Sequence, residues 1–158
     1  MIFVTVGTQP NGFLRCLKEV EKLIDHYQIK DEIIAQIGNT DFETSKFKTI
    51  PFTSVNEFEE YISKASVVIT HAGSGAIFNS IKAGKKIIAV ARLHEFNEMA
   101  DNHQTEIVKK LSESGYLIDG TYSLIDAWQK LDNFVPRNND FRNEIVSVLD
   151  KWISDWMN

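Results

Sequence analysis

The sequence predicts an α/β domain built on a doubly wound, Rossmann-like parallel sheet, and three observations favour this fold class. Short apolar segments of strand length alternate with longer segments in which apolar residues recur at helical spacing. Segment 66–70 reads Ser-Val-Val-Ile-Thr, a β-branched run without polar alternation, which is typical of a strand buried on both faces of a parallel sheet. Two of the strand-like segments end at a glycine, Gly7 and Gly38.

The first half of the chain predicts three strands and two helices. The strands are expected at 2–6, 32–37 and 48–52. Between positions 13 and 27, apolar residues recur at helical spacing with charges between them, which indicates the first helix. Ser54 and Glu57 have the spacing of a capping box, so the second helix is expected to follow and to run through about residue 62.

The second half continues the alternation. Strands are expected at 66–70, 87–91 and 116–118, and helices at 76–83, 101–115, 121–131 and 140–156. Asp101 and Gln104 resemble a second capping box, so the helix at 101–115 is expected to be capped at its start. The strand at 116–118 follows this helix. Residues 132–139, which include Pro136, form a plausible hinge before the C-terminal helix.

Composition excludes several classes of protein. With 158 residues, 43% hydrophobic and 25% charged, the chain is neither disordered nor fibrous, and its length suits a single domain. A net charge of −5 argues against a nucleic-acid binder. Cys16 is the sole cysteine, which excludes an internal disulfide, disfavours a cysteine-based zinc site and suggests a reducing compartment. The start of the chain lacks the basic region of a signal peptide, and the longest apolar run, 87–91, is too short to span a bilayer.

In an open parallel sheet, ligands bind beyond the carboxyl ends of the strands. Three segments follow predicted strands there: 7–12, 71–75 and 92–104. The second is the most informative, because Gly73, Ser74 and Gly75 place bare backbone N–H groups at the start of a helix. Such a turn is suited to phosphate or diphosphate, although a tight strand-to-helix connection needs the same glycines.

This turn matches three standard motifs only in part. A dinucleotide fingerprint fails because Phe78 stands where the third glycine belongs, and a P-loop fails at Asn79. A small-residue version of the nucleophile elbow of hydrolases is closer, with Ser74 as nucleophile. This hydrolase hypothesis needs a later histidine, and His94 and His103 both follow soon after.

The segment after the strand at 87–91 offers polar side chains. Arg92 and His94 come directly after the strand and are candidates for contact with an anionic ligand. Asn102, His103 and Gln104 stand at a predicted helix start, where they suit sugar hydroxyls. They are equally compatible with a capping box and two exposed residues in the first turn, and both roles can coexist.

Four motifs, in this order and spacing, resemble the donor-binding half of family 28 glycosyltransferases, over about residues 2–117. They are Val-Thr-Val-Gly-Thr at 4–8, Thr-His-Ala-Gly-Ser-Gly at 70–75, Gly-Lys-Lys at 84–86 and Asp-Asn-His-Gln at 101–104. The chain looks most like the small catalytic subunits of two-component enzymes. These include the eukaryotic subunit that adds the second N-acetylglucosamine to dolichol-linked sugar, and bacterial capsule and exopolysaccharide subunits, which the segment 91–96 favours.

The resemblance assigns roles to individual positions. The diphosphate of a UDP-sugar would be contacted by Gly7, Thr8, His71, Ala72, Gly73, Ser74 and Gly75. Thr53 would meet the uracil through its backbone, and Asn102, His103 and Gln104 would read the sugar hydroxyls. Relatives usually carry Glu where this chain has Asn79, at a position associated with the ribose. Asn79 carries no charge, so its contact with the ribose is expected to be weaker, and the resemblance implies the donor less specifically.

The resemblance further implies one donor-binding half of a two-domain GT-B glycosyltransferase. The implied reaction inverts the anomeric centre and moves a hexose from a UDP-sugar to a polyprenyl-diphosphate-linked sugar, without a metal or other cofactor. The general base would be His71, His94 or a group of the partner. A membrane-anchored, acceptor-binding subunit would recruit this cytoplasmic chain to the membrane, with the helix at 138–158 as a possible docking element. The alternatives are a non-catalytic UDP-sugar-binding enhancer of a partner enzyme, and the Ser74 hydrolase.

Overall fold

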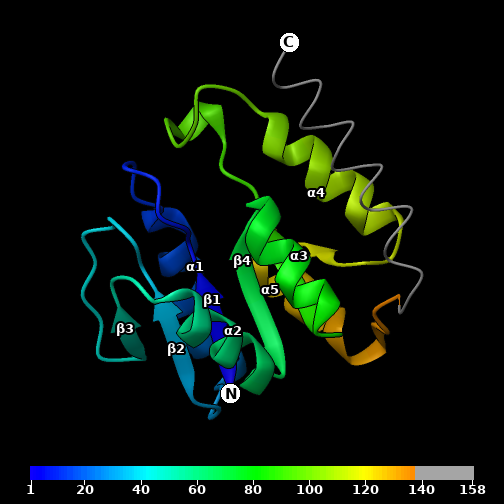
Figure 1. The fold of residues 1–158 in the computed structure, drawn as a ribbon, viewed down its shortest axis with the longest axis horizontal. Coiled ribbons are helices and arrows are strands. Elements are labelled where there is room, and N and C mark those ends of the chain that lie inside the picture. Colours follow the sequence, from blue (N-terminus) through cyan, green and yellow to red (C-terminus); the bar gives the residue numbers. More distant parts are fainter. Residues whose placement is uncertain (138–158) are drawn as a thin grey trace.

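The computed structural model describes residues 1–137 and confirms the predicted α/β class. Six parallel strands form one sheet in the order β3-β2-β1-β4-β5-β6 (Figure 1). Their bounds are β1 Ile2–Thr5, β2 Ile33–Gln36, β3 Lys48–Ile50, β4 Val67–His71, β5 Lys86–Val90 and β6 Ile118–Asp119. The order reverses between β1 and β4, which makes the carboxyl ends of these two strands the topological switch point.

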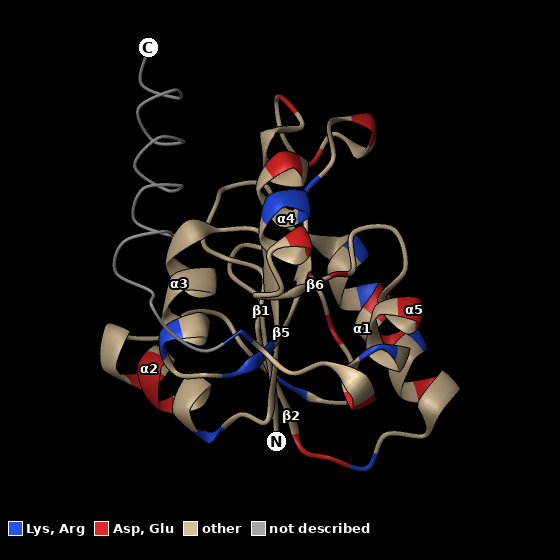
Figure 2. Cartoon of the chain, turned by 90° about the vertical axis from the view of Figure 1, so that its right-hand side faces the viewer, with Lys and Arg blue, Asp and Glu red and all other residues tan. Residues whose placement is uncertain are grey.

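Helices cover both faces of the sheet. Their bounds are α1 Leu14–Tyr27, α2 Val55–Lys64, α3 Ser74–Lys82, α4 His103–Glu113 and α5 Leu124–Gln129, with 3₁₀ turns η1 His94–Phe96 and η2 Leu131–Asn133. Figure 2 views the sheet nearly edge-on, with α1 and α5 on one side and α2 and α3 on the other. The fold is therefore doubly wound.

The alternation along β1 explains why two separate cores form. Ile2 and Val4 face the core under α1 and α5, whereas Phe3 packs with Ile62 of α2 on the opposite face. A third cluster joins α3 and α4 to β5 through residues such as Ile87. Because side chains of a strand point alternately to the two faces, strands that are covered on both sides must be apolar throughout, as the sequence is.

The capping box of α2 is confirmed. The Ser54 hydroxyl accepts a hydrogen bond from the Glu57 N–H at 3.3 Å, and the Glu57 carboxylate accepts one from the Ser54 N–H at 2.8 Å. The Ser54 hydroxyl also donates to the Glu57 carboxylate at 2.7 Å, and this bond, together with the one from the Ser54 N–H, holds the pKa of Glu57 below its usual range.

The second capping box, predicted for Asp101 and Gln104, is wrong. Helix α4 begins at His103, and the side chain of its N-cap residue, Asn102, makes no capping hydrogen bond. Asp101 accepts from the His103 N–H instead, and Gln104 is buried with its side-chain oxygen turned toward the backbone of Arg92. The spacing of a capping box was present, but burial of Gln104 directs its side chain into the protein.

Two further boundaries differ from the prediction. Tyr116 and Leu117 belong to the core under α3 and α4, and strand β6 begins only at Ile118. The helix expected at 121–131 begins after Ser123, whose hydroxyl accepts from the Asp126 N–H and thereby sets its start. The predicted C-terminal helix, 140–156 within the proposed docking segment 138–158, lies outside the described residues.

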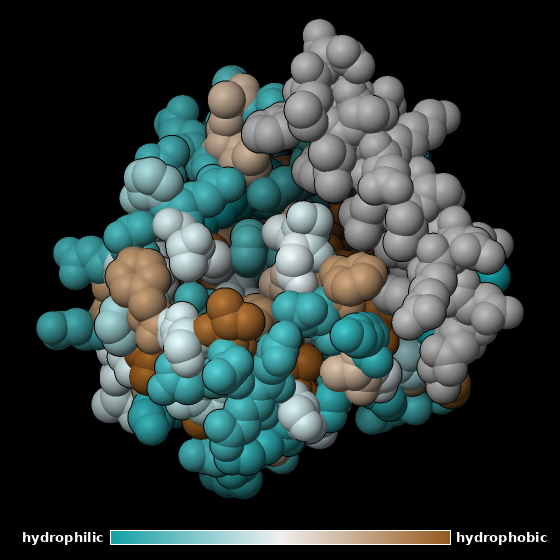
Figure 3. Space-filling model, viewed as in Figure 1, coloured by the Kyte–Doolittle hydropathy of each residue, from teal (hydrophilic) through white to brown (hydrophobic). Residues whose placement is uncertain are grey.

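No helix within residues 1–137 is long and apolar enough to cross a membrane. On the face of the molecule shown in Figure 3, hydrophilic side chains separate small apolar patches of the described chain. Large apolar side chains that are exposed occur at both sides of the carboxyl edge, with Phe52 and Val55 after β3 and Leu14 and Phe96 near the start of α1.

Candidate functional site

The switch point is built around the imidazole of His71, which lies between two glycines. His71 ends β4, Gly7 follows the neighbouring strand β1, and Gly73 precedes α3. A Cβ atom on Gly7 would lie 2.6 Å from Nε2 of His71, and one on Gly73 would lie 2.2 Å from the same atom. Both positions therefore require glycine to accommodate the ring, and at Gly7 the positive φ of 78° adds a second reason.

His71 is neutral at physiological pH. Its Nδ1 lies 3.4 Å from the main-chain oxygen of Thr5, which can only accept, so Nδ1 carries the hydrogen and Nε2 carries the lone pair. Burial of the ring, and secondarily the charge of Arg92, lower the pKa of His71 to about 4. A group with this pKa is a weak base near pH 7, which does not suit a general base.

The turn after β4 leaves the start of α3 without a side-chain cap. Gly73 is the N-cap residue, and it has no hydroxyl or carboxylate to bind the N–H groups of the first turn. Ser74 and Gly75 open the helix, and a Cβ atom on Gly75 would meet no atom within 4 Å. The predicted anion site at 71–75 thus combines free helical N–H groups with open space beside Gly75.

Loop 7–12, which faces this turn across His71, is held by Asn39, which the sequence did not point to, and by Gly38, which was expected only to end a strand. The Asn39 side chain donates to the main-chain oxygens of Thr8 and Gln9 at 3.1 and 3.0 Å. A Cβ atom on Gly38 would lie 2.2 Å from the Gly7 oxygen, so Gly38 permits the close approach of the two loops. The Gly-Asn pair directly after the strand at 32–37, at the same edge, is the signal that could have identified them.

Arg92 is not positioned as the anion contact that the sequence suggested. Its side chain is 1% exposed, and both terminal nitrogens donate to the backbone of loop 6–12. Its backbone N–H donates to the Gln104 side-chain oxygen at 3.0 Å. Arg92 thus connects the end of β5 to the loop after β1 from inside the protein.

A partly buried ion pair anchors the segment after β5. Arg15 of α1 binds both carboxylate oxygens of Glu98 at 2.9 Å and also donates to the main-chain oxygens of Ala91 and Thr121. Glu98 also accepts from the Leu93 N–H at 2.9 Å. The pair thereby positions segment 91–98, and its two members are too far apart in sequence for any local pattern to indicate it.

The predicted sugar-reading segment is partly occupied by internal contacts. The Asn102 side-chain oxygen accepts from the His94 N–H at 2.9 Å, and Gln104 is engaged with Arg92. His103 is exposed, with Nε2 3.8 Å from an oxygen of Asp101. His94, the other candidate base, is exposed in η1, so these side chains do gather at the carboxyl edge beyond β5.

Two predicted nucleotide contacts lie away from His71. Thr53 is half-buried in the loop after β3, beside the exposed Phe52. Asn79 is half-buried on α3 and lines a cavity of about 250 Å³ between α2 and α3, together with Glu59 and Lys82. Position 79 lies more than one turn into α3, beyond the uncapped N–H groups of its first turn.

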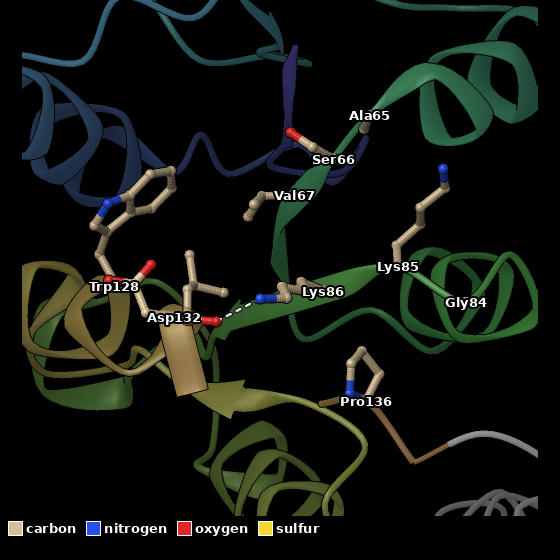
Figure 4. A pocket seen from close by; sticks show the side chains of 10 residues that line it. Ala65, Ser66, Val67, Gly84, Lys85, Lys86, Trp128, Asp132 and Pro136 are labelled. Atoms are coloured by element: carbon tan, nitrogen blue, oxygen red, sulfur yellow. Dashed lines mark hydrogen bonds between the residues drawn. The ribbon is translucent and has the colours of Figure 1, made fainter. Parts of the chain in front are cut away.

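The opposite edge of the sheet holds a larger cavity of about 510 Å³, shown in Figure 4. Ser66 and Lys86 at the amino ends of β4 and β5 line it, with Trp128 and Asp132 across from them. Lys86 donates to the Leu131 oxygen at 2.6 Å. This edge is not where open parallel sheets bind nucleotides.

Within residues 1–137, Ser74 makes no side-chain hydrogen bond to a histidine, so the pairing that a serine hydrolase needs is not formed there. In the same residues, no three His, Cys, Asp or Glu side chains are grouped to hold a metal ion. Cys16 is fully buried, and burial raises the pKa of its thiol to about 12.

Comparison with known proteins identifies relatives of this chain. The family described as glycosyltransferase family 28 C-terminal domain matches residues 1–144. The human UDP-N-acetylglucosamine transferase subunit ALG13 is 30% identical over 123 residues, which cover 73% of this chain and 10% of that protein. The chain thus spans about a tenth of the human relative's length.

Solved structures share the fold. The solution structure of ALG13 has a TM-score of 0.62 and 21% identity, covering 94% of this chain and 93% of that one. The glycosyltransferase SnogD from Streptomyces nogalater has a TM-score of 0.55 and 16% identity, covering 82% of this chain and 33% of SnogD. The chain therefore has the architecture of one domain of a GT-B glycosyltransferase.

Proposed function

Because the chain belongs to glycosyltransferase family 28, whose C-terminal domain it matches over residues 1–144, we propose that it binds a UDP-sugar at the carboxyl edge of its sheet and is the catalytic, donor-binding subunit of an inverting glycosyltransferase. The observation that carries the proposal is the uncapped start of α3 at the switch point. There the free N–H groups of the helix lie next to His71 and the loop that begins at Gly7.

In the proposed reaction, the diphosphate is bound by residues 71–75 and by loop 7–12. As the bond between sugar and phosphate breaks, negative charge grows on the departing UDP. The N–H groups and the dipole at the start of α3 stabilise that charge, without requiring a metal or other cofactor. The bare backbone at Gly75 allows the phosphate to approach these groups.

The acceptor hydroxyl needs a base, and two histidines were candidates. The low pKa of His71 and its position between Gly7 and Gly73 argue against that residue. We therefore assign His71 a supporting role beneath the diphosphate and place the base at His94 or on the partner subunit. His94 is exposed on the same edge, which leaves it accessible to an acceptor.

The proposed substrates follow from the resemblance. The donor is a UDP-hexose, including UDP-N-acetylglucosamine, which the human relative's name specifies for that protein. The proposed acceptor is a polyprenyl-diphosphate-linked sugar, in capsule or exopolysaccharide synthesis. Asn79, at a position where relatives usually carry Glu, is proposed to contact the ribose more weakly.

A partner subunit completes the proposal. We place acceptor binding and membrane attachment on a second chain, which brings this one to the cytoplasmic face of the membrane. A groove of about 460 Å³ beside Gly12 supports this assignment, because the exposed Leu14 and Phe96 line it together with Lys18. The residues 138–158, outside the described part, remain the proposed docking helix, and residues 1–158 are proposed to be one nucleotide-sugar-binding domain.

The proposal is tested by calorimetry on the full chain with UDP, UDP-glucose, UDP-galactose and UDP-N-acetylglucosamine, with and without the partner. We expect UDP to bind the chain alone and one UDP-sugar to bind more tightly than the others. Transfer to a polyprenyl-diphosphate-linked acceptor only with the partner present would support the catalytic role. Absence of UDP binding would overturn the proposal, and an ester hydrolysis that Ser74→Ala abolishes would favour the hydrolase.

A further inference from the structure

Arg92 is a buried cation that binds only main-chain oxygens. One terminal nitrogen donates to the oxygens of Asn11 and Gly12 at 2.9 and 3.0 Å, and the other donates to the Val6 oxygen at 3.0 Å. The guanidinium also stacks on the Phe13 ring, 4.6 Å from its centroid. Its Nε has no hydrogen-bond partner in the described part of the chain. A single side chain thus holds both ends of loop 6–12.

Among residues 1–137, no carboxylate forms an ion pair with this cation. Glu98 is the nearby anion, but Arg15 occupies both of its oxygens at 2.9 Å. The group of buried or partly buried charges beneath the loop therefore contains two guanidinium groups and one carboxylate, and the thiol of Cys16 is protonated. Burial of an unpaired charge is costly, so the retained positive charge is best explained if an anion binds nearby.

The positive charge of Arg92 lies close to the switch point. The carbonyl groups that Arg92 binds belong to the loop that contains Gly7, and Gly7 packs against the ring of His71. The charge of Arg92 acts on that ring, where it contributes to the low pKa of His71. His71 is in turn flanked by Gly73, the N-cap residue of α3. The positive electrostatic potential of Arg92 therefore extends toward the start of that helix.

We propose that Arg92 is a positioning residue for the diphosphate of the UDP-sugar. It holds loop 6–12 in the shape that the diphosphate requires and supplies positive charge from beneath the loop, without touching the ligand. This inference rests on the proposed function, and it gives the buried Arg92 a different role from the direct anion contact expected from sequence. A guanidinium suits this role because its planar fork spreads its donors toward both ends of the loop, whereas an ammonium is a compact point charge.

The test uses the full chain and three variants. Arg92→Met removes the charge and the fork but keeps a long apolar stem. Arg92→Lys keeps the charge and loses the fork. Lys109→Gln removes a positive charge from the exposed side of α4, where the Lys109 side chain is 74% exposed, and serves as the matched control. UDP affinity is measured by calorimetry, the pKa of His71 by NMR of the imidazole, and folding by circular dichroism.

For Arg92→Met we expect UDP to bind about tenfold or more weakly, as is typical when hydrogen bonds to a charged group are lost. The pKa of His71 should rise by the share that the Arg92 charge contributes and stay below its ordinary value, because burial is the larger cause. Arg92→Lys should keep the pKa of His71 low and still weaken UDP binding, and Lys109→Gln should change neither quantity. Folded Arg92 variants that bind UDP as tightly as the unchanged chain would overturn the proposal. If Arg92→Met does not fold, Arg92→Lys decides; if neither folds, Arg92 is a stability residue and the proposal fails.

The experiment distinguishes failure of the role proposed for Arg92 from failure of the proposed function. If the unchanged chain does not bind UDP, the proposed function is wrong. The NMR titration of His71 in the variants would still show whether Arg92 acts on the switch point.

Discussion

Arg15 and Glu98, 83 residues apart in the chain, form a two-pronged ion pair with both N···O distances at 2.9 Å. The side chain of Glu98 is 9% exposed and that of Arg15 is 21% exposed. The pair connects α1 to the segment between β5 and α4. It thereby links the half of the sheet that contains β1 to the half that contains β5, near the switch point.

The first prediction concerns this pair. Glu98→Ala should lower the free energy of unfolding by about 2 kcal/mol, because it leaves the partly buried Arg15 without an anion and the buried Leu93 N–H without an acceptor. Arg15→Met combined with Glu98→Ala should recover part of this loss. Urea denaturation of the single and double variants measures both effects. The matched control is Glu60→Ala, which removes an exposed helix pair with Lys64 and should leave stability unchanged within error; equal losses for Glu98→Ala and Glu60→Ala would contradict the assignment.

The second prediction concerns the open space at Gly75. Gly75→Leu should leave the fold intact, since a Cβ atom there meets nothing within 4 Å, but should weaken UDP binding by about tenfold or more by blocking the helical N–H groups. Ala83→Leu, at the other end of α3, is the control. Calorimetry with UDP and a thermal melt separate binding from folding. Gly73→Val cannot serve this purpose, because its side chain would collide with His71.

The third prediction is a dependence of stability on pH through His71. Its pKa of about 4 in the folded protein is below the ordinary value of 6.5, so between these values the unfolded chain binds a proton that the folded chain does not. Stability should therefore fall as pH drops from about 6.5 toward 4. His71→Gln should lose this contribution and show a shallower fall in urea denaturation between pH 7 and 5. Parallel profiles for the two proteins would show that His71 titrates normally.

The fourth prediction separates the two roles of the segment at 102–104. His103→Ala, at an exposed position, should weaken UDP-sugar binding and leave UDP binding unchanged if the segment reads the sugar. Gln104→Ala should weaken both, because it also removes the hydrogen bond to the backbone of Arg92. Calorimetry with UDP and the preferred UDP-sugar measures both ligands. No effect of His103→Ala on either ligand would leave that side chain outside the sugar site.

The sequence by itself determined the parts of the protein that depend on neighbours along the chain. Apolar runs of strand length and helical periodicity indicated the elements in order, because a strand that is covered on both faces is apolar throughout and a helix faces the core every third or fourth residue. Ser54 and Glu57 were read correctly as a cap, since both partners lie within one turn. The glycine-rich turn at 71–75 was likewise visible, and its place at the carboxyl edge followed from the expected parallel sheet; the strand order of the structure places it at the switch point.

Only the tertiary structure decided which of the polar side chains face a ligand. Gln104 matched the spacing of a cap, yet burial turned it toward Arg92, and Arg92 was itself directed into loop 6–12, 80 residues or more away in sequence. Gly7 and Gly73 were expected to make room for phosphate, but the ring of His71 occupies the space beside both. Such contacts arise when distant segments meet at the sheet edge, where buried polar groups must find partners, and no local periodicity records which partner each group finds.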